Sequence, residues 1–143
     1  MEKKANKFTT FITMMLFVFA VAFLMAMTGC GSTEDLKLRD LEFTVLSEEK
    51  IPEQLLPMLE EKKAEPFQFT YSDDENLYIC VGYGKQESGG YSIAVNELYL
   101  TEENIYADTN LLGPETAEKS NKVPSYPYII IKTEYLDKTV IFE

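Results

Sequence analysis

The chain of 143 residues contains no histidine and no tryptophan, and only two cysteines. Without histidine it lacks the commonest general base, the usual partner of a nucleophilic serine or cysteine, and the commonest metal ligand. A structural zinc site needs thiolates or imidazoles, and the chain has few of the former and none of the latter. We therefore expect a protein that is not an enzyme and that holds neither a metal nor a cofactor.

Basic residues are also scarce. Lysine and arginine together number 13 against 24 aspartates and glutamates, which gives a formal net charge of −11. Binding to nucleic acid needs basic patches against phosphate, and adhesion to anionic lipid head groups needs them too. The composition therefore argues against nucleic acid as a partner. Its acidic surface keeps the domain soluble or attracts a basic protein partner.

The N-terminal segment has the parts of a secretory signal. A basic start (Lys3, Lys4 and Lys7) precedes an apolar run from residue 11 to residue 27, and the small residues 28–29 come directly before Cys30. This order resembles a lipoprotein signal, in which residues 1–29 are removed and Cys30 carries the lipid, palmitate included. More than one acyl chain gives stable anchoring, because each buried CH₂ adds about 0.8 kcal/mol.

An uncleaved signal anchor is the alternative. The 17 residues of this run, apolar except for Thr13, span roughly 26 Å at about 1.5 Å each, short of a hydrocarbon core of about 30 Å, although a tilted helix from Phe8 could span it. Both interpretations place the rest of the chain outside the cytoplasmic membrane. We expect residues 30–35 to form a short tether and residues 36–143 to form one outward-facing domain on the cell membrane.

Removal of residues 1–29 leaves few cysteines and a stronger negative charge. Three lysines and Glu2 are lost, so 10 basic and 23 acidic residues remain, a formal charge of −13. Only Cys80 then accompanies the lipidated Cys30, which leaves no intramolecular disulfide available. Because the neighbours of Cys80 in the chain are apolar and aromatic, we expect a buried thiol.

Hydrophobic alternation predicts a domain of the α+β class. Strands are expected at residues 41–46, 66–71, 77–82, 91–100, 105–109, 126–132 and 139–142. One helix is expected between them, either with Pro52 in its first turn and a kink at Pro57, or beginning only near Pro57. Short connections favour a largely antiparallel sheet with this N-terminal helix packed on it, in a single small domain. Residues 72–76 form a turn that bonds its own backbone, with a calcium loop as the weaker alternative.

Four glycines, Gly82, Gly84, Gly89 and Gly90, lie between the strands at residues 77–82 and 91–100. The dinucleotide fingerprint requires its third glycine three residues after the second, and Glu87 occupies that position. The glycines instead predict the bend of a β-hairpin, where positive φ angles are needed. Pro127 marks a second structural turn, at the start of the strand expected at residues 126–132.

All nine tyrosines lie between residues 71 and 135. Tyrosine is common in strands, so a tyrosine-rich sheet is one interpretation. A binding face is the other, because tyrosine offers a large contact area at low entropic cost. Tyr83, Tyr91, Tyr126 and Tyr128 flank the two most unusual loops, so these four are the candidate interaction residues.

Two segments about 35 residues apart resemble a known family. They are Gly-Lys-Gln-Glu-Ser-Gly-Gly-Tyr-Ser-Ile at residues 84–93 and Val-Pro-Ser-Tyr-Pro-Tyr-Ile-Ile-Ile-Lys at residues 123–132. Together they resemble the PrcB C-terminal domain, named for a subunit of a secreted bacterial protease complex, over about residues 77–132. The resemblance implies a non-catalytic accessory lipoprotein that associates with, or stabilises, an exported protease.

Two other functions stay open at this point. A module that binds peptide or cell-wall sugar would use the tyrosines directly. Direct inhibition of a protease would use the loop from Lys85 to Ser88.

Overall fold

The computed structural model describes Ile12, residues 35–115 and residues 122–143. The predicted signal at residues 1–29, the lipidation site Cys30 and most of the tether therefore lie outside the described residues, apart from Ile12. A compact unit is formed by Asp35–Glu143. Among the described residues, no helix is long and apolar enough to cross a membrane.

The described part of the compact unit holds eight strands, one α-helix and one 3₁₀ turn. In chain order they are β1 (Arg39–Asp40), β2 (Phe43–Val45), η1 (Glu48–Lys50), α2 (Leu56–Lys62), β3 (Pro66–Ser72), β4 (Asn76–Tyr83), β5 (Ser92–Leu100), β6 (Asn104–Leu112), β7 (Tyr128–Glu134) and β8 (Thr139–Phe142). Each predicted strand is present within a few residues of its expected bounds. The predicted α+β class, mostly antiparallel with one helix packed on the strands, is confirmed.

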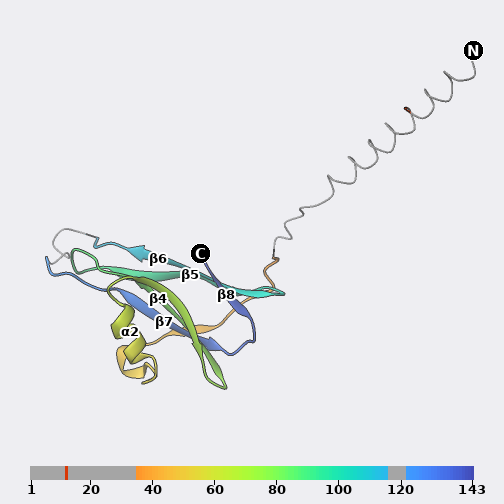
Figure 1. Cartoon of the computed structure of the whole chain (residues 1–143), viewed down its shortest axis with the longest axis horizontal. Helices are drawn as coiled ribbons and strands as arrows, with labels where there is room; N and C mark the ends of the chain where they lie inside the picture. Colours follow the sequence, from red (N-terminus) through yellow and green to blue (C-terminus); the bar gives the residue numbers. More distant parts are fainter. Residues whose placement is uncertain (1–11, 13–34, 116–121) are drawn as a thin grey trace, which may run out of the picture. The chain divides into compact units, whose positions relative to one another are not determined.

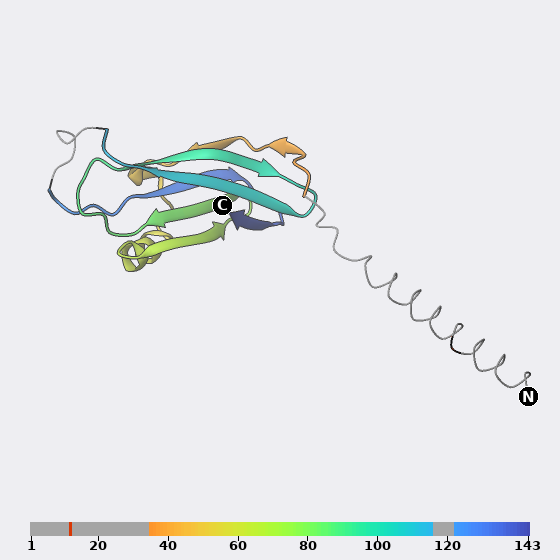
Figure 2. The same ribbon diagram turned by 90° about the horizontal axis from the view of Figure 1, so that it is seen from above.

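The strands form two sheets of four. Sheet A has the order β1-β5-β6-β8, and sheet B has the order β2-β7-β4-β3. All pairings are antiparallel except that of β6 with β8, which is parallel. Figure 1 shows β5 and β6 in one layer, β4 and β7 in the next, and α2 on the far side of β4 and β7. Seen from above in Figure 2, β5 and β6 lie in front, and no described helix covers them.

The predicted hairpin of residues 77–82 with 91–100 is wrong. β4 pairs with β3 on one side and with β7 on the other, so both of its edges are occupied within sheet B. β5 pairs instead with β1 and β6 in sheet A. The glycine-rich segment between β4 and β5 is therefore a crossing from one sheet to the other. The turn at residues 135–138 likewise passes from β7 in sheet B to β8 in sheet A.

Strand β4, in the middle of sheet B, is buried on both faces. Leu77, Ile79 and Val81 of β4 face sheet A and pack with Leu98 and Ile105 of that sheet, beside Ile131 of the neighbouring strand β7. The alternate residues Tyr78 and Cys80 face α2, where they pack with Leu55, Leu59 and Ile130. A strand buried on both faces is continuously apolar, which explains why residues 77–81 show no polar position. Each fully buried aliphatic side chain contributes about 1.5–3 kcal/mol.

The helix begins where the second sequence interpretation placed it. α2 starts at Leu56 with Pro57 in its first turn, so the missing N–H of Pro57 breaks no helical hydrogen bond. Leu55 and Leu59 are one helical turn apart and both are buried against sheet B. The helix is therefore fixed by burial of this stripe rather than by its length of 7 residues.

Candidate interaction surface

The crossing between β4 and β5 meets the segment that precedes β7. The backbone N–H of Gln86 donates to the carbonyl of Ser125 at 2.8 Å, and the N–H of Ser125 donates back at 3.1 Å. The hydroxyl of Ser125 donates to the carbonyl of Ser88 at 2.7 Å, and the side-chain amide of Gln86 donates to the carbonyl of Tyr83 at 2.9 Å. The two sequence motifs, far apart in the chain, thus form one hydrogen-bonded unit.

Two of the four glycines are required by close contacts. Gly84 has φ +68°, and a Cβ there would lie 2.9 Å from the Cδ and N atoms of Pro66. Gly82 lies within β4 rather than in the bend, and a Cβ there would lie 2.3 Å from the ring of Phe67. The ring of Phe67 therefore packs directly on the backbone of Gly82. Gly89 and Gly90 lie in the crossing itself.

The four candidate tyrosines do not share one face. The hydroxyl of Tyr83 lies between the sheets, 2.9 Å from the carbonyl oxygen of Thr109. Tyr91 is half-buried, with its ring 3.7 Å from the position that a Cβ of Gly113 would take. Tyr128 is on the opposite face of sheet B from Tyr83, because it packs with the cluster under α2. Only Tyr126 and Tyr128 line a common groove.

That groove has a volume of about 340 Å³ and runs beside the start of β7. Its lining is mostly apolar: Val45, Leu46, Glu48, Ile51, Tyr126, Pro127, Tyr128, Ile129 and Ile130. Val45 is 47% exposed and Tyr126 is 39% exposed. We call this surface the Tyr-Pro-Tyr groove. A concave surface lined by apolar side chains is typical of a site that accepts an apolar anchor residue from a partner.

The groove exists because β2 ends early. β2 pairs with residues 131–133 of β7, and the N–H of Leu46 still donates to the carbonyl of Ile130 at 2.9 Å. Since backbone groups on one edge of a strand recur at every second residue, those of Tyr128 point toward the groove. In the part of the chain that the structure describes, β2 does not reach them. Pro127 donates no hydrogen bond, and its carbonyl accepts from the N–H of Tyr83 at 3.0 Å.

The phenol of Tyr128 stays neutral at physiological pH. Burial raises its pKa above the ordinary value of 10, and the nearby carboxylates of Glu48 and Glu60 raise it further, while Lys63 opposes them. Lys63 itself is held by Glu60 at 2.6 Å on the surface of α2. Tyr128 therefore offers a hydroxyl donor at the acidic rim of an apolar groove.

A second, larger groove of about 800 Å³ lies where β1 and β2 meet the end of β7 and the start of β4. Its lining mixes charges of both signs, with Arg39, Lys50 and Lys132 against Glu42, Glu75 and Glu134. Arg39 donates to Glu134 at 2.6 Å. Because the charges balance and one pair is already joined, this groove has no preference for anions or for cations.

The environment of Cys80 disfavours reaction of its thiol. Cys80 is fully buried in β4, and burial raises the pKa of its thiol to about 12. The reactive form of cysteine is the thiolate, which this environment excludes at physiological pH.

Sequence reasoning missed one wall of the Tyr-Pro-Tyr groove. Val45 and Leu46 were assigned to a half-buried strand, and Ile51 to a helix, so neither segment was connected with residues 126–128. The available signal was the interruption at residues 47–50, which ends β2 and uncovers the edge of β7.

Residues 77–134 match the family model described as PrcB C-terminal. This confirms the family resemblance drawn from the two motifs, and the matched segment runs from β4 to the end of β7. A search of curated proteins and a search of solved structures each found no match.

Proposed function

Because residues 77–134 match the PrcB C-terminal family model, we propose that the chain is a non-catalytic surface lipoprotein that binds an exported protease or another exported protein. Cys30 carries the lipid, and the domain faces outward from the cytoplasmic membrane. The Tyr-Pro-Tyr groove is the contact surface.

The groove carries this proposal because one of its walls, residues 126–130, lies within the family segment and because its apolar side chains are exposed. Val45 and Tyr126 are each more than a third exposed, beside the start of β7, where β2 does not pair with it. Aromatic residues around a small apolar pocket are typical of the energetic centre of a protein interface. Tyr83 supports structure instead, since its hydroxyl bonds to Thr109.

Site-specific crosslinking in the native membrane tests the contact. A photoreactive amino acid at Tyr126 is expected to capture an exported protein, and a protease among the captured proteins supports the proposed partner. The control places the same amino acid at Asn110, which is exposed on sheet A. Identical capture at both positions, or none at Tyr126, would contradict the proposal.

Mass spectrometry of the mature N-terminus tests the anchor separately. We expect a chain that begins at Cys30 and carries acyl groups. An unmodified Cys30 within an intact chain would rule out lipidation, and the signal-anchor alternative would then hold.

A further inference from the structure

Away from the Tyr-Pro-Tyr groove, we propose that the free edge of β3 binds an extended segment with a basic end from an exported protein, by adding a strand to sheet B. The inference rests on the proposed function only in taking the partner to be an exported protein. The surface, its chemistry and its test are separate.

β3 is the longest edge strand of the described domain. It pairs with β4 at all 7 positions from Pro66 to Ser72, without a bulge, and no described strand pairs with its other side. The other strands at the ends of the two sheets are shorter, with 2 residues in β1, 3 in β2 and 4 in β8. A long, regular edge strand is a template for pairing with another chain.

The free edge presents a regular set of donors and acceptors. The N–H of Asp73 donates to the carbonyl of Asn76 at 3.0 Å, which closes the β3–β4 ladder. Because hydrogen-bonded positions alternate along an antiparallel strand, the backbone groups of Gln68, Thr70 and Ser72 point away from β4. These three residues are exposed, and sheet A does not cover them.

Apart from Pro66 at its first position, the strand lacks the usual protection against such pairing. Residues 66–72 include no charged residue, although 26% of the chain is charged. Phe67, Phe69 and Tyr71 lie on the side of α2, and the rings of Phe67 and Phe69 are 5.6 Å apart. Phe69 and Tyr71 remain half-buried. An added strand would cover them with its own side chains, as cross-strand neighbours do.

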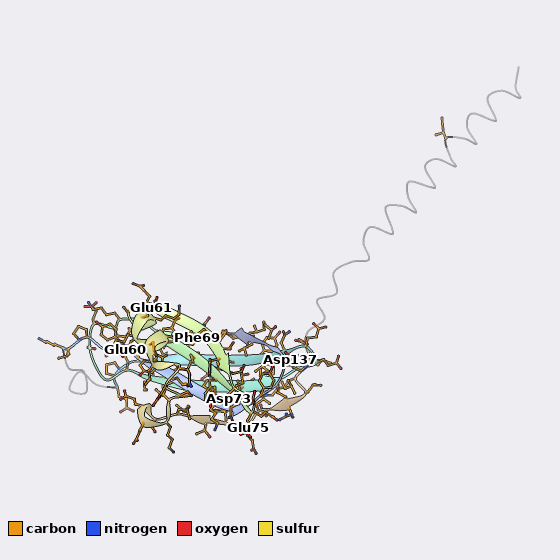
Figure 3. All side chains as sticks on the ribbon, turned by 60° about the horizontal axis from the view of Figure 1, so that its bottom comes forward. Glu60, Glu61, Phe69, Asp73, Glu75 and Asp137 are labelled. Atoms are coloured by element: carbon orange, nitrogen blue, oxygen red, sulfur yellow. The ribbon has the colours of Figure 1, made fainter. Side chains whose placement is uncertain are left out.

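The negative charge at one end of the β3 edge favours a partner segment with a basic end. Ser72 leads directly into Asp73, Asp74 and Glu75, which carry three negative charges at one end of the edge. Figure 3 shows Phe69 between this acidic turn and the glutamates at positions 60 and 61 of α2. The hydrogen bonds that Asp73 accepts hold its pKa at about 2, so it stays ionised at physiological pH. A segment with lysine or arginine at the end that reaches the turn complements this surface.

A second copy of the chain fits this edge less well than a basic segment. Each copy has a formal charge of −11, so two copies repel each other. The occupant is therefore a strand of opposite charge, and self-pairing becomes an outcome of the test.

The test follows amide hydrogen exchange in the full chain, held in detergent micelles. The probe is a synthetic peptide of alternating valine and threonine that ends in two lysines, and its control ends in two glutamates. With the lysine peptide, exchange at Gln68, Thr70 and Ser72 is expected to slow at least tenfold, without change at Tyr128. The glutamate peptide is expected to bind at least tenfold more weakly in low salt, and the difference should shrink as salt screens the turn.

A proline at the edge provides the matched variant. Thr70→Pro removes an outward donor and leaves the ladder to β4 intact, so it should abolish binding, whereas Thr70→Val should preserve it. Protection of Ile79 shows whether Thr70→Pro remains folded. If it does not, the charge reversal Asp74→Lys with Glu75→Lys gives an independent test, because it should weaken the lysine peptide and strengthen the glutamate peptide.

Three results would overturn the inference. They are absence of protection on β3 at millimolar peptide, protection at the Tyr-Pro-Tyr groove in its place, and dimerisation of the full chain that Thr70→Pro abolishes. The experiment contains no protease, so its failure leaves the crosslinking test of the proposed function standing. Failure of the crosslinking likewise leaves the peptide result standing.

Discussion

The hydroxyl of Tyr83 in sheet B lies 2.9 Å from the carbonyl oxygen of Thr109 and 3.0 Å from its hydroxyl in sheet A. The N–H of Glu143 donates to the carbonyl of Ala107 at 3.0 Å, just where β8 ends. The carbonyl of Thr109 is the next one on the same edge of β6. The hydroxyl of Tyr83 therefore satisfies a carbonyl of β6 that lies beyond the end of β8, and this hydrogen bond joins the two sheets.

Tyr83→Phe should lower the free energy of unfolding by about 1–3 kcal/mol, because it leaves a partly buried carbonyl without its donor. Urea denaturation followed by circular dichroism measures this change. The control is Tyr91→Phe, which removes the hydroxyl of a tyrosine that makes no such bridge between the sheets. Equal stability of Tyr83→Phe and the unchanged chain would show that the bridge contributes nothing.

The contact between Gly82 and Phe67 predicts a steric effect. In Gly82→Ala the new methyl group would lie 2.3 Å from the Phe67 ring, so the ring must shift, at a cost of about 1–3 kcal/mol. Gly113→Ala is the matched control, because its nearest neighbour would be 3.7 Å away. Thermal unfolding of both variants gives the comparison. The double variant Gly82→Ala with Phe67→Leu should be less destabilised than the sum of its parts, and strict additivity would contradict the contact.

The sequence predicted the elements well and their pairing poorly. Alternation located the strands because it depends on neighbouring residues. Which edges pair depends on contacts far apart in the chain. The turn from Asp73 to Asn76 gives β4 its first partner, β3, and the second edge of β4 goes to β7, so no edge is left for β5. Glycines between two strands usually indicate a hairpin, and here Gly84 serves a crossing instead.

The candidate site could be predicted only in part, because it too depends on contacts between residues far apart in the chain. Tyr126 and Tyr128 were named from their own motif, and both line the groove. Tyr83 belongs to the same region of sequence but faces the opposite side of sheet B. Alternate residues of a strand point to opposite faces of the sheet. The face of Tyr83 could be predicted only if the strand was known to extend to it, and the expected strand ended at residue 82, whereas β4 ends at Tyr83.

The turn after β3 predicts a dependence on acid. The carboxylate of Asp73 accepts from the N–H of Glu75, the hydroxyl of Tyr78 and the N–H of Asn76, and these bonds lower its pKa from 3.8 to about 2. Its stabilising contribution is therefore complete above pH 3.8 and is lost as the pH falls toward 2. In Asp73→Asn the urea midpoint should fall less steeply between pH 4 and pH 2. Asp74→Asn, which removes a carboxylate without these bonds, should keep the steep fall.

Cys80 should resist thiol reagents in the folded chain. Its thiol is fully buried and has a pKa of about 12, so the reactive thiolate is scarce at pH 8. Mass spectrometry of the peptide that contains Cys80, after treatment with iodoacetamide, is expected to show modification only as urea unfolds the domain. Rapid modification without urea would mean that β4 opens far more readily than its burial implies.

Val45 tests whether the Tyr-Pro-Tyr groove binds a partner. Val45→Asp places a charge on the apolar wall of the groove, where a docked side chain would desolvate it, so capture of the partner by the full chain should fall at least tenfold. Stability should change little, because Val45 is 47% exposed in the free domain. The control Leu112→Asp alters a residue of similar exposure, 44%, on sheet A, outside the groove. Partner capture measured for both variants under identical conditions decides the point, since an equal loss in both would place the contact elsewhere on the domain.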